Sequence, residues 1–159
     1  MSVKNYYIFD LDDTLYQKND GQIQNCINSQ NLKKIKDKNG FIIVFSNASY
    51  NHCIFWIDKL KISKYISVII STDIIGGLKP DLVVYLKLMM VCNISRNDNI
   101  FFFDNLKSNL VSGKKIGWNT LLIHPTINID DLDSCEKNQI DYVFKDINLA
   151  IEYLMENCK

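Results

Sequence analysis

Apolar residues in this chain gather in short runs that are separated by longer, mixed segments. The runs are continuous rather than alternating, as at residues 41–45 between Gly40 and Ser46. Continuous runs of this length are typical of strands that are covered on both faces. We therefore predict strands at residues 6–9, 41–45, 66–70, 99–103 and 120–123, and a short edge strand at 142–144.

Between these runs, apolar residues recur at helical spacing. The first helix is predicted to have Ser29 as its N-cap, to bury Leu32 and Ile35, and to stop at Gly40. Further helices are predicted at about 48–60, from Pro80 at the first helical position to about 91, at 107–116 and at 146–157. Their predicted buried positions are Tyr50, Cys53, Ile57 and Leu60, then Leu82, Leu86 and Met89, and finally Ile147, Ala150, Ile151 and Leu154. Residues 16–21 and 125–139 are polar and are predicted to be loops.

Strands and helices alternate along the chain. This pattern predicts an α/β fold with a doubly wound (Rossmann-like) parallel sheet of about five or six strands, helices on both faces, and one domain over residues 1–159. In such sheets the site lies beyond the carboxyl ends of the strands. The residues that follow each strand are therefore the candidate functional residues.

Polar side chains follow several of these predicted strands. They are Asp10, Asp12 and Asp13 after the first, Ser46 and Asn47 after the second, Lys79 ahead of a helix, and Asp104 and Asn105 after the fourth. Each has a structural explanation, because Ser, Asn and Asp are good N-caps and a single Lys is usually solvated. Together they supply two carboxylates for a divalent cation, a hydroxyl at a helix N-terminus for an anion, and a positive charge.

Charge and cysteine content narrow the function further. Lys plus Arg and Asp plus Glu both number 18, so a nucleic-acid partner is not favoured, and the lysines at 33, 34, 36 and 38 are interpreted as a solvated helix face. The five cysteines are scattered without C-x-x-C spacing, which favours reduced thiols over disulfides or a zinc site. No apolar run is long enough to span a bilayer. We expect a soluble, intracellular, cytoplasmic protein.

The order of the motifs resembles the haloacid dehalogenase (HAD) superfamily. The matching residues are D-x-D-x-T-L at 10–15, Ser46 at a strand end, G-L-K-P-D at 77–81, and Asp104-Asn105 at another strand end with Asn109 and Gly113 beyond it. The tail at 141–147 is similar to the last strand and helix of such domains. The resemblance covers nearly the whole chain and implies a Mg²⁺-dependent phosphatase, without identifying the substrate.

The resemblance implies a role for each matching residue. Asp10 would attack the phosphomonoester and form a phosphoaspartyl intermediate, with Asp12 as general acid and then base. Mg²⁺ would be held by the Asp10 carboxylate, the Asp12 carbonyl and Asp104. The transferring phosphate would be bound by Thr14, which also holds the turn, and by Ser46, Asn47 and Lys79. Lys79 would in addition act in catalysis by pairing with Asp10, which keeps the nucleophile ionised and in place. Asp13 is interpreted as a bystander that faces solvent or the turn.

Two departures from the family pattern bear on the prediction. Asn105 stands where many relatives carry a second acid, and an amide can hold a metal-bound water but adds no charge. The segments between motifs leave no room for a cap domain, so we predict a capless type with an open site. That arrangement fits a phosphoprotein, or a small phosphorylated molecule enclosed by a neighbouring subunit in a homo-oligomer.

Two alternatives remain open at this stage. The first alternative to a phosphatase is a HAD-like binding module with weak or no catalysis, which Asn105 supports. The second is a phospho-receiver domain. In a receiver, Asp12 and Asp13 would hold the metal, Asp73 would accept the phosphoryl group, and a Lys would replace His124 after the fifth strand. His52 and His124 are interpreted as structural. Phe55 lies opposite the predicted buried face of its helix and is interpreted either as buried between layers or as a subunit contact.

Overall fold

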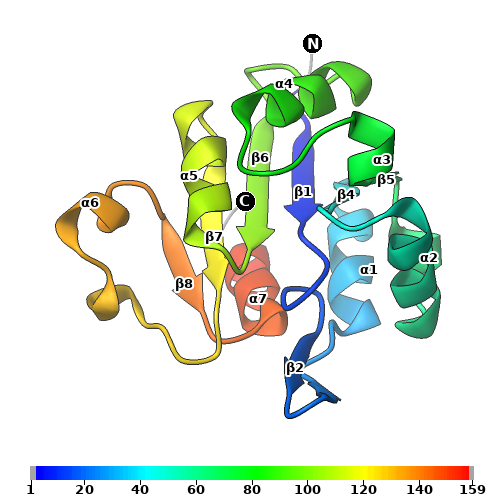
Figure 1. Ribbon diagram of the computed structural model, residues 1–159, viewed down its shortest axis with the longest axis horizontal. Coiled ribbons are helices and arrows are strands. Elements are labelled where there is room, and N and C mark those ends of the chain that lie inside the picture. Colours follow the sequence, from blue (N-terminus) through cyan, green and yellow to red (C-terminus); the bar gives the residue numbers. More distant parts are fainter. Residues whose placement is uncertain (1–2, 158–159) are drawn as a thin grey trace.

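The computed structural model describes residues 3–157 and contains a six-stranded parallel sheet with helices on both faces (Figure 1). The strand order is β5-β4-β1-β6-β7-β8, which places β1 between β4 and β6. The strands are β1 (Asn5–Phe9), β4 (Phe41–Phe45), β5 (Val68–Ile70), β6 (Asn99–Asp104), β7 (Asn119–Ile123) and β8 (Tyr142–Phe144). The predicted doubly wound, Rossmann-like α/β fold is confirmed.

The two faces of the sheet carry separate hydrophobic cores, because successive side chains of a strand point to opposite faces. Tyr7 and Phe9 of β1 pack with α1, α2 and α7, whereas Tyr6 and Ile8 pack with α3, α4 and α5. The helices are α1 (Ser29–Asp37), α2 (Tyr50–Lys59), α3 (Thr72–Ile75), α4 (Leu82–Val91), α5 (Lys107–Lys115), α6 (Ser134–Lys137) and α7 (Ile147–Asn157). Burial on both faces explains the continuous apolar runs of the strands.

The structure corrects details of the first two helices. The N-cap of α1 is Asn28 rather than Ser29, because the Asn28 side chain accepts a hydrogen bond from the backbone of Gln30 at 2.9 Å. The predicted buried residues Leu32 and Ile35 of α1 are confirmed, as are all four in α7. In α2, Cys53 and Ile57 are buried as predicted, Leu60 just beyond the helix is partly buried, and Tyr50 is exposed. Phe55 is also exposed, so its burial between layers is wrong, and a subunit contact stays a prediction.

The largest error in the predicted elements concerns α4. The Lys79–Pro80 peptide bond is cis, and the helix begins only after its N-cap Asp81, so Pro80 is not the first helical residue. The buried residues are Val84, Tyr85 and Leu88, whereas Leu86 is exposed and Leu82 and Met89 are half-buried. Every residue of α4 except Lys87 is apolar or aromatic, so the sequence gives no amphipathic pattern from which to choose a face.

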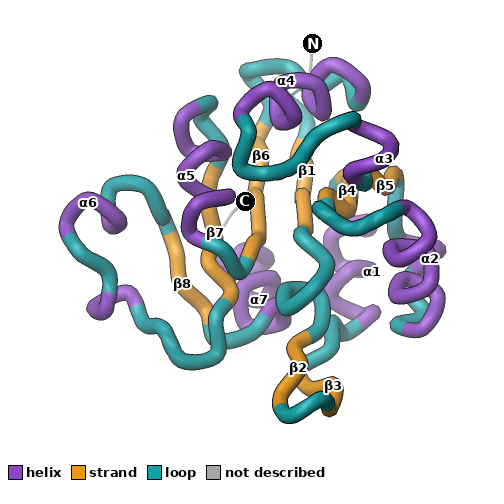
Figure 2. Tube along the Cα trace, in the orientation of Figure 1, coloured by secondary structure: helices purple, strands orange, loops and turns teal. Residues whose placement is uncertain are grey.

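Short elements occupy both segments that were predicted as loops. The first holds an antiparallel hairpin of β2 (Gln17–Asn19) and β3 (Gln22–Gln24), which projects beyond the carboxyl end of β1 (Figure 2). Asp20 and Gly21 turn this hairpin with positive φ angles of 50° and 76°. The second contains η2 (Ile129–Asp131) and α6, and a further short helix, η1 (Ser63–Tyr65), precedes β5.

No separate cap domain is inserted between the described elements. The chain between β1 and β4 forms only the hairpin and α1, and the chain between β4 and α4 forms only α2, η1, β5 and α3. Of the helices in residues 3–157, none has both the length and the apolar character needed to cross a bilayer. Cys26, Cys53, Cys92 and Cys135 are free thiols, and Cys158 lies outside the described residues.

Candidate active site

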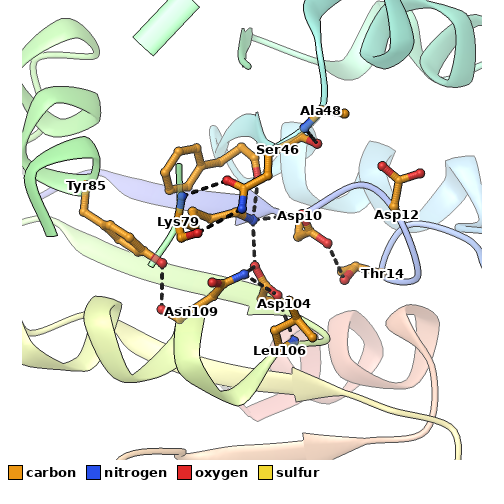
Figure 3. Close-up of polar contacts among 12 residues, drawn as sticks. Asp10, Asp12, Thr14, Ser46, Ala48, Lys79, Tyr85, Asp104, Leu106 and Asn109 are labelled. Atoms are coloured by element: carbon orange, nitrogen blue, oxygen red, sulfur yellow. Dashed lines mark hydrogen bonds and ion pairs between the residues drawn. The ribbon is translucent and has the colours of Figure 1, made fainter. Parts of the chain in front are cut away.

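Three charged side chains meet at the carboxyl ends of the two central strands. Phe9 of β1 pairs with Phe103 of β6, so Asp10 and Asp104, which follow them, lie side by side. Lys79, from the loop before α4, extends between them (Figure 3). Its Nζ lies 2.8 Å from Asp10 Oδ1, 2.7 Å from Asp104 Oδ2 and 2.8 Å from the carbonyl oxygen of Phe45. The family resemblance implied the Lys79–Asp10 pair, whereas the direct contact between Lys79 and Asp104 was not predicted.

Burial makes this cluster electrostatically strong. Asp10 is 8% exposed, Lys79 4% and Asp104 0%. Burial raises the pKa of Asp10 from 3.8 to about 7, and the repulsion from Asp104 adds to it, against the opposing attraction of Lys79. For Lys79, burial favours a lower pKa, but the two carboxylates outweigh it and raise the pKa, so the ammonium is a fixed positive charge. One cation therefore faces two carboxylates in a site largely shielded from water.

Asn47 holds the backbone of Lys79. Its Nδ2 donates to the carbonyl oxygen of Lys79 at 2.9 Å, and its Oδ1 accepts from the Lys79 N–H at 2.8 Å. The next carbonyl, that of Pro80, accepts from the Ser112 hydroxyl at 2.6 Å. These bonds link Lys79 to the end of β4 and to α5. Phosphate binding by Asn47 stays a prediction, and the contacts that it makes orient Lys79.

Asp104 is held by α5 and the loop before it. Its Oδ1 accepts from the backbone N–H of Leu106 at 2.9 Å, and Asn109 Nδ2 donates to both Asp104 oxygens at 3.1 and 3.0 Å. The Asn109 carbonyl in turn accepts from the Tyr85 hydroxyl of α4 at 2.8 Å. Asn109 was part of the sequence motif without a stated role, and the structure gives it one in fixing Asp104.

Thr14 and Ser46 lie on the other side of Asp10. The Thr14 hydroxyl donates to Asp10 Oδ2 at 3.2 Å, so the predicted turn-holding residue contacts the candidate nucleophile itself. Ser46 is buried, its Oγ accepts from the Ala48 N–H at 3.0 Å, and the Cys53 thiol is a second partner of the same hydroxyl. Both hydroxyls therefore lie where β1 and β4 end.

Asp12 occupies a different environment from Asp10, although only Leu11 separates them. Its carboxylate takes no part in the Lys79 cluster and points away from it (Figure 3). It contacts the Tyr16 hydroxyl and His52 Nε2, which lies 2.9 Å from Oδ1 and 3.1 Å from Oδ2. Sequence reasoning assigned His52 no part in the site. A signal was present, because His52 lies at the start of the helix that follows Ser46.

Asp13 and Asn105 line a cavity beside the cluster. Asp13 has a positive φ of 60°, and its Oδ1 accepts from the Lys18 N–H of the hairpin at 3.4 Å, which agrees with its expected place at the turn. The cavity has a volume of about 210 Å³ and is also lined by His124 and Lys18. His124, predicted as structural, therefore lies at the rim of the site.

The receiver alternative does not agree with the structure. The sheet order found here is that of a Rossmann-type sheet, with two strands on one side of β1 and three on the other, whereas receivers have the flavodoxin-like order. Asp73, the required phosphoryl acceptor, instead accepts from the Ser71 hydroxyl at 2.5 Å and from the Tyr50 N–H at 2.9 Å. Asp73 thus lies in the first turn of α3 and accepts from the first N–H of α2, and no hydrogen bond joins its side chain to Asp12 or Asp13 among the described residues.

Comparisons with solved structures show similar folds at low sequence identity. A dehalogenase structure matches with a TM-score of 0.69 and 19% identity over 81% of this chain and 55% of that chain. A putative β-phosphoglucomutase from Thermotoga maritima matches with a TM-score of 0.67 and 18% identity over 80% of this chain and 58% of that chain. A predicted phosphoglycolate phosphatase from Haemophilus somnus 129pt matches with a TM-score of 0.63 and 14% identity over 78% of this chain and 54% of that chain. The chain thus spans little more than half the length of these proteins.

A family model extends the comparison to sequence. No curated protein matches the sequence, but the model for haloacid dehalogenase-like hydrolases matches residues 27–123. The matched part includes Ser46, Lys79 and Asp104, and it begins after Asp10 and Asp12, of which Asp10 contacts Lys79 directly. Because the match covers more than half of the chain, the protein belongs to the haloacid dehalogenase-like hydrolase family.

Proposed function

We propose that this protein is a Mg²⁺-dependent phosphatase that hydrolyses a phosphomonoester through a phosphoaspartyl intermediate on Asp10. The observation that carries the proposal is the buried cluster in which Lys79 contacts both Asp10 and Asp104. This cluster fixes a carboxylate nucleophile next to a buried ammonium, which offsets part of the negative charge that a phosphate would meet there.

The reaction would proceed in two steps. In the first, an Asp10 oxygen bonds to phosphorus as the bond to the leaving oxygen breaks, and the Asp12 carboxyl gives its proton to that oxygen. In the second, Asp12 takes a proton from water, the water oxygen attacks phosphorus, and the bond to Asp10 breaks to release phosphate. The Ser46 hydroxyl and the backbone N–H groups before α2 would bind the phosphoryl oxygens.

The oxygen donors of the cluster suit Mg²⁺. The Asp10 and Asp104 carboxylates and the Asp12 carbonyl are hard ligands, and Lys79 offsets only one of two negative charges. In residues 3–157 no three metal-ligating side chains converge, so waters would complete the set, one of them held by Asn105. When bound, Mg²⁺ would reduce the repulsion between the Asp10 carboxylate and an anionic phosphate.

The leaving group distinguishes a phosphatase from a dehalogenase. An alkoxide needs a proton as it leaves, whereas a halide leaves as a stable anion. Asp12, 40% exposed at its side chain and two residues from Asp10, supplies an acid at the open side of the site. It therefore favours an oxygen leaving group. Without a cap domain, we expect either a phosphoprotein or a small phosphorylated molecule as substrate.

The test is hydrolysis of a generic aryl phosphate with and without Mg²⁺. We expect phosphate release that requires Mg²⁺ and disappears in Asp10→Asn, with Asp13→Asn as the matched control because Asp13 lies outside the cluster. Activity that survives in Asp10→Asn would rule out this nucleophile. Halide release from a 2-haloacid would favour a dehalogenase, and absence of both activities would favour a binding module. A panel of sugar phosphates, nucleotides and phosphopeptides would then define the substrate.

A further inference from the structure

The Asp12 carboxylate is held by two side chains that the proposed reaction does not yet use. The Tyr16 hydroxyl donates to Oδ1, and His52 Nε2 lies within 3.1 Å of both oxygens. Tyr16 comes from the turn before the hairpin and His52 from α2, so the two contacts reach Asp12 from different elements.

Packing fixes the Tyr16 side chain, and Trp56 lies beside His52, which is 38% exposed at its side chain. Tyr16 is fully buried, and its ring stacks on that of Trp56 with 4.0 Å between centroids and an interplanar angle of 19°. Trp56 lies one turn after His52 on α2 and is itself buried, with its ring centroid 6.3 Å from that of His52. Residues that are held by packing lose little further freedom when they orient a neighbour. The Tyr16 contact to Asp12 therefore has a rigid support, and the same tryptophan lies beside His52.

We propose that His52 and Tyr16 are positioning residues that hold Asp12 for proton transfer to the leaving oxygen, an inference that rests on the proposed phosphatase function. Asp12 is about 40% exposed at its side chain, and a free carboxylate at that exposure would rotate among several positions. The two contacts select one of these positions. Because general acid catalysis requires hydrogen-bond reach, the two contacts raise the fraction of time in which transfer can occur.

The His52 contact is compatible with both steps of the reaction. A neutral imidazole carries its proton on either nitrogen, so Nε2 accepts a hydrogen bond in one tautomer and donates one in the other. It can therefore face Asp12 both when the carboxyl group carries the proton and after that proton has moved to the leaving oxygen. Tyr16 adds a donor to Oδ1.

The experiment compares two aryl phosphate esters whose leaving oxygens differ in their need for a proton. Phenyl phosphate releases a weakly acidic phenol, whereas 2,4-dinitrophenyl phosphate releases a strongly acidic one. The ratio kcat/KM reports the steps up to phosphoryl transfer to Asp10. We expect His52→Ala to lower kcat/KM for phenyl phosphate about 10- to 100-fold, part of what general acid catalysis supplies, and that for the dinitrophenyl ester less than about threefold.

Three further variants separate positioning from folding. Tyr16→Phe keeps the ring on Trp56 and removes only the hydroxyl, so a smaller loss with the same ester preference is expected. His52→Gln, which offers a side-chain N–H at a similar reach, should restore most of the His52→Ala loss. Asn51→Ala, at the exposed neighbour on α2, is the control and should match the wild type.

The outcomes distinguish this inference from the proposed function. Equal losses for both esters, or no loss, would overturn the positioning role while the wild-type hydrolysis still stands. Absence of wild-type hydrolysis would overturn both. A crystal structure of His52→Ala gives a readout that does not depend on activity. Asp12 should occupy more than one rotamer there, and a single unchanged rotamer would contradict the inference.

Discussion

Asp10 and Asp12 lie two residues apart and show how environment assigns different tasks to one residue type. Asp10 is buried against Lys79 and Asp104, with Thr14 on its second oxygen. Asp12 is half-exposed and contacts only neutral or weakly basic partners, His52 and Tyr16. A fixed, ion-paired carboxylate suits a nucleophile, and a carboxylate open to the leaving group suits an acid and base. The difference arises where the chain leaves β1, because Asp10 directly follows the strand and still bonds to the Phe103 carbonyl through its N–H, whereas Asp12 lies in the turn beyond it.

The largest effect is expected when Lys79, which defines the Asp10 environment, is removed. Lys79→Met leaves Asp10 and Asp104 buried without a cation, so we expect a loss of about 3–5 kcal/mol in the free energy of unfolding together with loss of activity. Denaturant titration measures it, with Lys18→Met of the exposed hairpin as the control. A change below about 1 kcal/mol would show that the ion pairs do not organise the buried centre.

Removing the negative charge of Asp12 should lower activity with little change in stability. We expect Asp12→Asn to lower kcat about 10²- to 10⁴-fold, because the acid and base is lost. The free energy of unfolding should change by less than about 1 kcal/mol, because the side chain is half-exposed. Steady-state kinetics and denaturant titration on one preparation measure both. A stability loss as large as that of Lys79→Met would contradict the contrast between the two carboxylates.

The smallest effect is a pH dependence of stability in the metal-free protein. The pKa of Asp10 is raised from 3.8 to about 7 by burial, so between these values the folded state binds more protons than the unfolded state. The stabilisation is present below about pH 4 and is lost as pH rises through about 7. With a chelator present, we expect the Tm of the wild type to fall as pH rises through this window. The Tm of Asp10→Asn should fall less over the same range. Identical slopes would show that Asp10 does not carry the raised pKa.

The sequence predicted the sheet and the meeting of Asp10 and Asp104 at its edge from local signals, whereas the Lys79–Asp10 pair was implied by the family resemblance and the Lys79–Asp104 contact was not predicted. Continuous apolar runs mark buried strands, and the carboxyl ends of parallel strands must share an edge. The buried face of α4 was missed because its residues are apolar almost all round, so burial is decided by packing against β6 and α5. The hairpin was missed although Asp20-Gly21 is a hairpin turn signal, because its strands are short and polar.

The environment of Asp12 could not be predicted from residue spacing. His52 belongs to α2, which follows β4, whereas Asp12 follows β1. A single His also forms no sequence pattern that would indicate a contact with Asp12. Its contact with Asp12 depends on the crossing of α2 over the turn that contains Tyr16, which Trp56 fixes by stacking. The roles of Thr14 and Asn109 have the same origin, since each acts through a carboxylate that only the folded chain brings near.

The central claim, that Asp10 is the nucleophile, is tested most directly by trapping the intermediate. The Asp12→Asn variant, mixed with Mg²⁺ and 2,4-dinitrophenyl phosphate, should accumulate an acyl phosphate because the base that activates water is missing. Quenching with borohydride converts an aspartyl phosphate to homoserine, which mass spectrometry of the peptides locates. The account predicts homoserine at residue 10. Homoserine at another carboxylate, or none while the dinitrophenol is released, would contradict it.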